Sequence, residues 1–333
     1  MSSTSLDLAL VGVTGVTGEQ VLAALASSDL VIGTLRAYAS ASRSPRVDTV
    51  NFRGQSVGVE PASALANVRP DLAILCVPSA AAAKLAASLV ARGVVVIDVG
   101  NATAGVLEAP VALPGVAELT AEAVAKAGAL RTPSSVGALL APVCAALRPV
   151  GLTGVSAVVS VAASARGRAG MEELGQQVVA TLNNQDPQRR IFVDGLAFDT
   201  LPEDVPTDEW STVEQVAMSE LTALTGLDRV VVQVATQPLF AGMSAGLHLR
   251  GVTVEAAEEA LRGAPGLVAV ARTARLRPRT FLGKPGVVWG RLRADPSGDG
   301  VHLWVVSDDL ASAGSNVVRA VTWLSGAGLL GVA

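Results

Sequence analysis

The first hundred residues alternate between short apolar runs and stretches whose apolar positions recur at helical spacing. Apolar runs stand at 8–11, 71–78 and 93–99, and helical spacing follows at 19–25 and 80–92. A short run that is apolar at nearly every position predicts a strand buried on both faces. Strands that alternate with helices predict a parallel sheet with right-handed crossovers. We therefore expect an α/β domain in this part of the chain.

A glycine-rich turn joins the first predicted strand to the first predicted helix, with glycines at positions 12, 15 and 18. In such a turn one glycine permits the tight bend, one lets the backbone approach a pyrophosphate, and one lets helix and strand pack closely. The start of the helix adds free N–H groups and a partial positive charge. The pattern predicts a Rossmann-type dinucleotide site, and the alternative is a plain tight turn.

Residues 37–40 predict a second strand, and the loop after it is where a nucleotide-binding domain reads the ribose. Ser42 and Arg43 stand in this loop. An acidic residue there selects the 2′-hydroxyl, whereas an arginine with small hydroxyl side chains suits a 2′-phosphate. These residues favour NADP over NAD. However, Asp48 is close in sequence, and an acidic residue in this loop would favour NAD instead. The alternative is a solvated loop arginine.

Beyond residue 134 the pattern predicts a second, mixed α+β domain. The stretch 135–147 is apolar at helical spacing and begins it. Further strands are expected at 155–161, 230–234 and 246–249, helices at 166–182 and 253–262, and a hairpin from 287–293 and 301–306. The last predicted helix, 316–324, returns to the first domain. The expected domains are therefore 1–134 plus 316–333, for dinucleotide binding, and 135–315.

Composition narrows the function. The chain has 333 residues, of which 50% are hydrophobic, 16% charged and 3% aromatic, with a net charge of -4. These values exclude a nucleic-acid-binding surface of the basic, aromatic kind. Two cysteines, Cys76 and Cys144, imply no disulfide framework and suggest a reducing compartment. With no signal peptide or membrane span expected, we predict a cytoplasmic protein.

The segment 12–18 reads Gly-Val-Thr-Gly-Val-Thr-Gly. It is followed in order by segments at 43–44, 52–55, 59–60, 168–174, 176–177, 196–199, 208–210, 288–293, 303–310 and Asn316. In these segments the chain resembles the aspartate-semialdehyde dehydrogenase family over nearly its full length, and 12–18 looks like the family's GxTGxxG loop. The resemblance implies a Rossmann-type domain, an α+β domain of the dimerisation and catalytic type, and a homodimer. It implies cofactor contacts at Gly12, Thr14, Gly15, Val16, Thr17, Gly18, Ser42, Arg43 and Asn316.

The resemblance also implies a mechanism whose groups are missing here. In the family a cysteine attacks the aldehyde, a histidine acts as base, NADP takes the hydride, and phosphate resolves the thioester. A thiol suits this chemistry because its pKa lies near neutrality. At the corresponding positions this chain has Ser135 for the cysteine and Met243 for the histidine. Ala245 replaces the family's glutamate in that second motif, and members of the USG-1 type likewise lack the catalytic pair.

Substrate-binding groups also differ from the family pattern. Ala104 stands where the family has a phosphate-binding arginine, Ser211 where it has a lysine, and Gln215 where it has a glutamate. The charges that would hold the substrate are therefore absent at these positions, and we expect no phosphorylating dehydrogenation of aspartate semialdehyde.

The remaining cysteines and histidines do not offer replacements. Cys76 ends a core strand, and Cys144 lies inside an apolar helix, where a thiol behaves as a small hydrophobic group. His248 follows Met243 by five residues, so on one strand the two would face opposite sides. His302 falls in the hairpin. Neither histidine has a cysteine or carboxylate partner at metal-ligand spacing, so we expect no metal.

Three hypotheses remain open. The first is a catalytically compromised relative that keeps the fold, the dimer and the cofactor site. The second is an active NADP-dependent oxidoreductase with altered catalytic residues. The third is a structural or regulatory subunit that has lost the nucleotide, against which the glycine turn and Arg43 argue. A short-chain dehydrogenase is excluded, because the only tyrosine, Tyr38, has a serine four residues later.

Overall fold

The computed structural model describes residues 5–40, 47–77, 79–99, 107–203, 209–271 and 274–330, with only the backbone described at 79 and 80. The chain divides into two compact units, residues 1–134 with 313–333 and residues 135–312. Each unit is built on one seven-stranded sheet, and each has its own buried core.

In the first unit the strands are parallel except at one edge. In spatial order they are β3 (Thr49–Phe52), β4 (Gln55–Pro61), β2 (Ile32–Ala39), β1 (Leu6–Val11), β5 (Leu72–Leu75), β6 (Val95–Asp98) and β7 (Ala129–Arg131). Among these strands only β3 and β4 pair antiparallel. The chain continues from β1 to β2 on one side and later to β5 on the other. This topological switch point is where open α/β sheets bind ligands, beyond the carboxyl ends of the strands.

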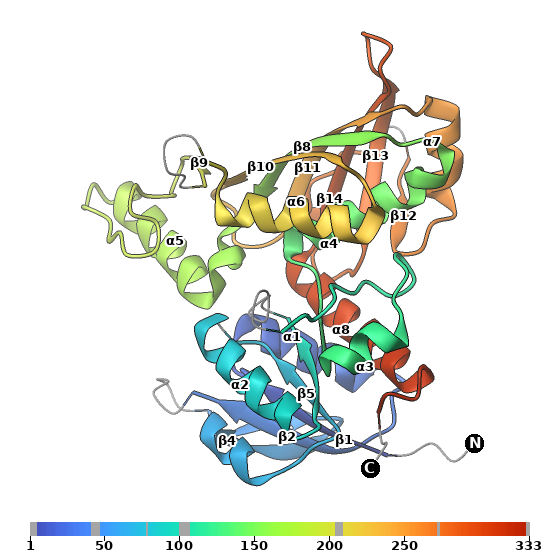
Figure 1. Ribbon diagram of the computed structural model, residues 1–333. Coiled ribbons are helices and arrows are strands. Elements are labelled where there is room, and N and C mark those ends of the chain that lie inside the picture. Colours follow the sequence, from blue (N-terminus) through green and yellow to red (C-terminus); the bar gives the residue numbers. More distant parts are fainter. Residues whose placement is uncertain are drawn as a thin grey trace. The chain divides into compact units, whose positions relative to one another are not determined.

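Helices cover both faces of this sheet (Figure 1). Leu8 and Leu10 of β1 share a core with Val317 in the last helix, whereas Ala9 and Val11 belong to the opposite core. Alternate residues of one strand therefore fill two cores, and the expected return of the C-terminal helix is confirmed. The first face carries α1 (Val16–Ser27), α3 (Ala121–Ala127) and α8 (Asp309–Gly326), and the second α2 (Ser79–Ala91) and the 3₁₀ turn η1 (Ala62–Asn67).

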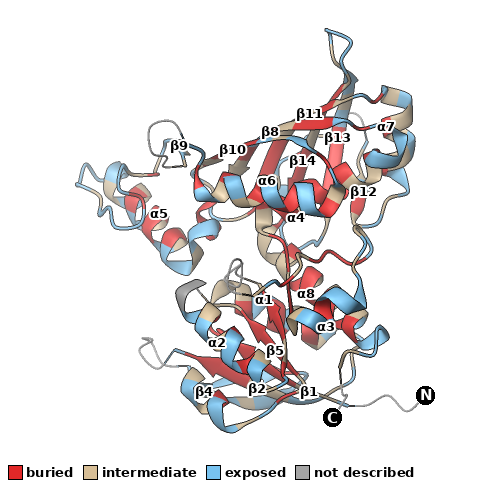
Figure 2. Ribbon diagram, in the orientation of Figure 1, coloured by how far each residue is buried: buried red, intermediate tan, exposed pale blue. Residues whose placement is uncertain are grey.

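The second unit has a mixed sheet, as the sequence predicts. In spatial order its strands are β12 (Leu267–Ala269), β13 (Val287–Ala294), β14 (Val301–Ser307), β11 (Met243–Arg250), β8 (Gly154–Val161), β10 (Arg229–Thr236) and β9 (Leu201–Pro202). One face is covered by α4 (Ser135–Leu147), α6 (Thr212–Thr225) and α7 (Val254–Arg262). In Figure 2 buried residues follow these strands and the helix sides that face them. Short 3₁₀ turns stand at η2 (Arg148–Val150), η3 (Ala163–Arg166) and η4 (Pro278–Phe281).

The other face of the second sheet leaves apolar side chains exposed. On β8, Val155 and Val159 are buried, whereas Val158 between them is 58% exposed. On the adjacent strand Val231 is 42% exposed. A hollow of about 430 Å³ lies on this face, lined by residues of β8, β10, β11, β13 and β14 that include Trp304. The strand alternation therefore predicts that something other than water covers this surface.

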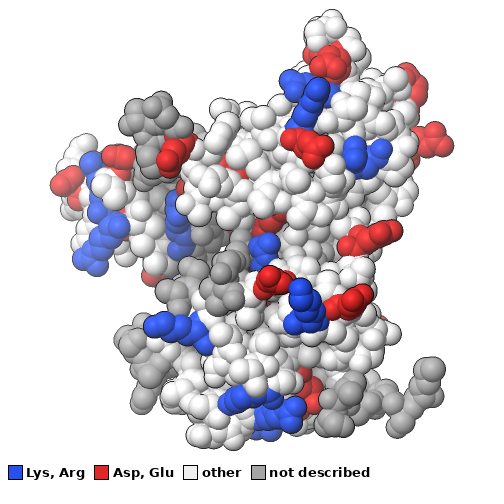
Figure 3. All heavy atoms as spheres, in the orientation of Figure 1, with Lys and Arg blue, Asp and Glu red and all other residues white. Residues whose placement is uncertain are grey.

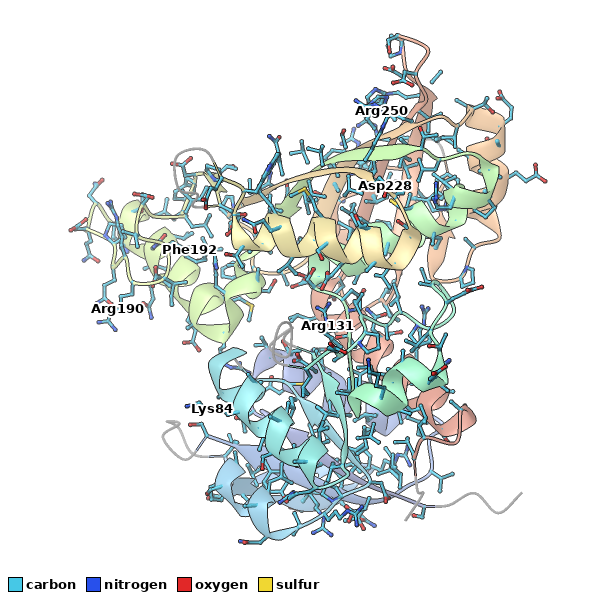
Figure 4. The ribbon with its side chains drawn as sticks, in the orientation of Figure 1. Lys84, Arg131, Arg190, Phe192, Asp228 and Arg250 are labelled. Atoms are coloured by element: carbon cyan, nitrogen blue, oxygen red, sulfur yellow. The ribbon has the colours of Figure 1, made fainter. Side chains whose placement is uncertain are left out.

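Beside this sheet, α5 (Gly167–Leu182) holds a long loop through buried polar groups. The carboxylate of Glu173 accepts the backbone N–H groups of Arg190, Ile191 and Phe192 over 3.1, 2.8 and 2.9 Å. Gln177, one turn later on α5, donates to the same carboxylate. Figure 4 shows Arg190 and Phe192 in the loop beside α5. These backbone N–H donors thus stabilise the negative charge of Glu173, which would otherwise be costly to bury.

The predicted helix 135–147 coincides with α4, whereas α6 was not predicted. None of the helices in the described part of the chain combines the length and apolar character that a membrane span requires.

Candidate functional site

The turn after β1 adopts a conformation that needs glycine. Gly12 has a φ of 87°, and its N–H donates to the carbonyl of Tyr38 over 2.8 Å. A Cβ atom at residue 12 would lie 2.3 Å from the carbonyl oxygen of Cys76, just beyond β5. A side chain would therefore collide with backbone. The turn lies at the carboxyl ends of β1, β2 and β5, which is the switch point of the sheet.

Helix α1 begins directly after this turn and packs closely against it. A Cβ atom on Gly18 would lie 2.1 Å from the carbonyl oxygen of Gly12, and one on Gly15 would lie 3.3 Å from the same atom. Gly15 is the N-cap, and no side chain caps the helix. The first-turn N–H groups of Val16 and Thr17 have no acceptor inside the helix. Together with the helix dipole they suit a phosphate group.

Two other predicted cofactor residues, Thr14 and Asn316, are buried in the first unit. Thr14 is 5% exposed, within the turn itself. Asn316 on α8 is 8% exposed, and α8 packs directly on α1, because a Cβ atom on Gly314 would lie 2.8 Å from the carbonyl oxygen of Gln20. The absence of a side chain at Gly314 therefore positions the helix that carries Asn316. Ser42 and Arg43, on which the choice of NADP rests, lie outside the described residues.

The positions that resemble the catalytic pair both belong to the second unit. Ser135 is the first residue of α4 and is partly exposed. Met243 is the first residue of β11, is 2% exposed, and lies opposite Ser307 of β14. Ala245, two residues along the same strand, is fully buried at 0% exposure. Neither a thioether nor a methyl group can take up a proton at neutral pH, so residues 243 and 245 supply no base.

A partly buried carboxyl group, that of Asp309, bonds to the residue before Met243 and was missed in the sequence. Asp309 accepts the N–H of Gly242 over 3.1 Å and the hydroxyl of Ser164 over 2.9 Å, one on each carboxylate oxygen. Burial raises the pKa of Asp309 above its ordinary value, against the opposing effect of these hydrogen bonds. The sequence feature that could have indicated Asp309 is the acidic pair at 308 and 309, directly after an apolar strand.

The position where the family has a lysine holds a helix cap. Ser211 is 4% exposed and accepts the N–H of Glu214 over 3.2 Å, while the Glu214 carboxylate accepts the N–H of Ser211 over 3.0 Å. This reciprocal capping box starts α6. Gln215 donates to the carbonyl of Trp210 over 2.7 Å. Both side chains therefore have structural partners, and Ala104 lies outside the described residues.

The two cysteines are unsuited to nucleophilic chemistry. Cys144 is completely buried inside α4, and burial raises its pKa to about 12. Burial, and to a smaller extent the negative charge of Asp98, also raises the pKa of Cys76 far above its usual range. At neutral pH both groups are thiols, whereas the nucleophile in thioester chemistry is the thiolate.

The histidines correct one sequence-based expectation. Met243 and His248 lie on one strand, and His248 lines the hollow on the open face together with His302. The two imidazole rings stack with centroids 4.9 Å apart. Contrary to the expectation that neither has a carboxylate partner, Nε2 of His302 lies 3.1 Å from Oδ1 of Asp295 and Nε2 of His248 lies 3.7 Å from Oδ2. Sequence spacing did not reveal this carboxylate partner, because the register of the paired strands brings the three residues together.

Comparison with known proteins gives matches across both units. A family profile described as "Semialdehyde dehydrogenase, NAD binding domain" matches residues 7–127, and one described as "Semialdehyde dehydrogenase, dimerisation domain" matches residues 140–312. An aspartate-semialdehyde dehydrogenase of Legionella pneumophila is 28% identical, with 95% of each chain covered. A USG-1 protein homolog of Pseudomonas aeruginosa is 29% identical, covering 92% of this chain and 94% of that protein.

Solved structures agree with the sequence matches. The structure of a probable aspartate-semialdehyde dehydrogenase from Pseudomonas aeruginosa superimposes with a TM-score of 0.88 at 27% identity, covering 97% of this chain and 99% of that one. The two-unit α/β architecture is therefore that of these proteins.

Proposed function

Because the chain belongs to the semialdehyde dehydrogenase family, we propose that it is a dinucleotide-binding member in which the dehydrogenase reaction is compromised. The observation that carries this proposal is the placement of its cysteines and histidines. The chain has two of each, and none of the four occupies position 135 or 243: one thiol follows β5, one is buried inside α4, and the imidazoles stack on the open face of the second sheet.

The substituted pair offers weak chemistry. The hydroxyl of Ser135 needs an adjacent base to become a nucleophile, and the side chain at 243 is a buried thioether. Restoring a proton acceptor would require another group, for which Asp309 is a candidate because it accepts the N–H of Gly242, the residue before Met243. Its two oxygens are already engaged by Gly242 and Ser164. We therefore favour loss of the reaction over a rearranged mechanism.

The cofactor site, in contrast, retains its main features. Gly12 and Gly18 make the close turn that a pyrophosphate requires, and α1 starts without a side-chain cap. The NAD-binding family profile covers this region. Arg43 and Ser42 favour NADP by their chemistry. When bound, the nicotinamide cofactor would supply hydride transfer, and the role of these residues is to hold its phosphates.

We also propose that two copies associate through the open face of the second sheet. Val158 and Val231 are exposed there around the 430 Å³ hollow, and the dimerisation family profile spans these strands. Val158→Asp should shift the molecular mass measured by light scattering toward the monomer. Val31→Asp, at a site 53% exposed in the first unit, is the matched control. An unchanged mass for Val158→Asp would contradict this interface.

A steady-state assay tests the loss of catalysis. Aspartate semialdehyde, NADP and phosphate are supplied, and NADPH formation is followed, with the Legionella pneumophila relative measured in parallel. We expect no turnover above background. Turnover comparable to that relative would overturn the proposal and would favour an active enzyme with altered residues, in which case Asp309→Asn would be the first variant to test as a substitute base.

Cofactor binding is tested separately. NADPH should raise the melting temperature in a saturable manner, because a ligand that binds only the folded state stabilises it by mass action. NADH serves as the comparison for the 2′-phosphate. A melting temperature unaffected by either nucleotide would favour a structural or regulatory subunit without cofactor.

A further inference from the structure

The chain's two histidines and one aspartate lie close together beside the hairpin of β13 and β14. His248 of β11 and His302 of β14 lie directly opposite each other in the antiparallel register. Asp295 comes from the hairpin end of β13 and faces both imidazoles. One ligand atom from each residue can be chosen so that all three lie within 4.8 Å of one another. We propose that these side chains form a binding site for a divalent transition-metal ion.

The donor set suits such an ion. Two imidazole nitrogens and one carboxylate oxygen are typical ligands of zinc and of neighbouring transition metals, with bonds of about 2.0–2.2 Å. Ligand atoms of a tetrahedral site are then roughly 3.3 Å apart. The separations of 3.1 Å from His302 Nε2 to Asp295 Oδ1 and of 3.7 Å from His248 Nε2 to Asp295 Oδ2 fall on either side of that value, each to a different oxygen of the carboxylate. Because the rings stack, at least one must turn about its Cβ–Cγ bond to close on the ion.

The hairpin holds the carboxylate in place before any ion arrives. The N–H of Asp295 donates to the carbonyl of Gly300 over 2.9 Å, and its own carbonyl accepts the N–H of Gly298 over 3.0 Å. Ser297 donates a hydrogen bond to the Asp295 side chain. A Cβ atom on Gly300 would lie 2.1 Å from the carbonyl oxygen of Leu249. The turn therefore packs against β11, beside His248, by direct contact between backbone atoms.

Charge around the cluster is compatible with a cation. The Asp295 side chain, which accepts a hydrogen bond from Ser297 and lies beside His302, brings a negative charge to the cluster. The nearby guanidinium of Arg250 lies 3.4 Å from the carboxylate of Asp299. Figure 4 labels Arg250 beside the hairpin, and Figure 3 shows side chains of both charges gathered around it.

In the single chain an ion can reach the site from solvent, whereas in the dimer proposed above the same hollow faces the second copy, so the ion lies beside that interface. The side chains of His248 and His302 are 21% and 34% exposed, and both line the hollow of the open face. The three residues supply three ligands, which leaves the remaining coordination positions to water. All three residues belong to the second unit, and none of them is a predicted cofactor residue or one of positions 135 and 243.

The test uses the full-length protein without a histidine tag, stripped of metal by chelation. Zn²⁺ is titrated calorimetrically, and Co²⁺ is followed by its visible absorption. We expect one ion per chain and d–d bands of a nitrogen and oxygen site. His248→Asn, His302→Asn and Asp295→Asn should each weaken binding by about tenfold or more. Asp299→Asn, which removes the same charge from the same turn, should leave the affinity nearly unchanged.

A second measurement uses the unsubstituted protein and therefore does not depend on whether the variants fold. The chain has only two histidines, so imidazole ¹⁵N spectra of the unsubstituted protein contain two ring systems. Zn²⁺ should shift both rings together and in proportion to occupancy. Three results would overturn the proposal: no saturable binding at micromolar metal, undiminished binding in the His248→Asn/His302→Asn protein, or a thiolate charge-transfer band with Co²⁺ that assigns the ion to a cysteine.

Discussion

Helix α1 and the turn after β1 approach so closely that a Cβ atom on Gly18 would lie 2.1 Å from the carbonyl oxygen of Gly12. Real Cβ atoms do not come so near to backbone, so the helix start depends on a missing side chain. The same contact sets the position of the first-turn N–H groups that we propose bind the cofactor phosphates. Stability and nucleotide binding therefore share one structural cause.

Gly18→Ala should consequently damage both properties. The added methyl group forces α1 away from β1, which should lower the melting temperature and weaken the stabilisation by NADPH. Gly175→Ala is the matched control, because it also lies within a helix but its Cβ atom would meet only Phe240 at an ordinary 3.7 Å. There the better helix propensity of alanine should stabilise by up to about 1 kcal/mol. Equal effects of the two substitutions would contradict the close-packing argument.

Glu173→Gln tests the carboxylate that anchors the loop after α5. The amide places an N–H₂ group where Arg190, Ile191 and Phe192 direct N–H donors, so at least one donor loses its acceptor. Leaving a buried donor unsatisfied costs about 1–3 kcal/mol. The melting temperature should fall and limited proteolysis should cut the loop sooner. Glu172→Gln, at the exposed neighbouring position, should change neither, and an equal loss there would contradict the anchor.

The sequence predicted elements that local patterns determine, and it missed arrangements that strand register determines. The helix α4 was predicted because residues 135–147 are apolar at helical spacing. Helix α6 was missed, although Ser211 and Glu214 carry the spacing of a capping box and could have indicated its start. The glycine turn was recognised because its constraint lies within seven residues.

No local pattern could have brought His248 to Asp295. The two residues meet because β11 pairs with β14 and the β13–β14 hairpin folds back on Leu249. A bulge between Gly290 and Arg293 also shifts the register of β13. Such pairings depend on the whole sheet. The role of Asp309 was hidden for the same reason, since its partners Ser164 and Gly242 are distant in sequence.

Asp309 gives a prediction with a definite sign in pH. Burial raises its pKa above the ordinary 3.8, so the folded protein binds this proton more tightly than the unfolded chain. The associated stabilisation is fully present below the ordinary pKa and is lost as the pH rises through the raised pKa. The melting-temperature difference between the unsubstituted protein and Asp309→Asn should therefore be greater at pH 4 than at pH 7.

The control for this pH series is Asp228→Asn, because Asp228 is an exposed carboxylate in the same unit (Figure 4). Its melting-temperature difference should change less between the two pH values. A difference for Asp309→Asn that grows as the pH rises would reverse the predicted sign and would mean that hydrogen bonds to the ionised form outweigh burial.

Restoring the catalytic pair should not restore the family reaction. Ser135→Cys with Met243→His returns a thiol and an imidazole to the positions of the resemblance, but residue 243 is 2% exposed, and burial disfavours the imidazolium that a general base must form. Ser211, at the position of the family's lysine, still caps α6 and carries no charge, so the substrate charge stays unpaired. Turnover of aspartate semialdehyde should stay near the background of Ser135→Cys alone. Strong turnover by the double variant would show that the substrate site is intact and that only the pair was lost.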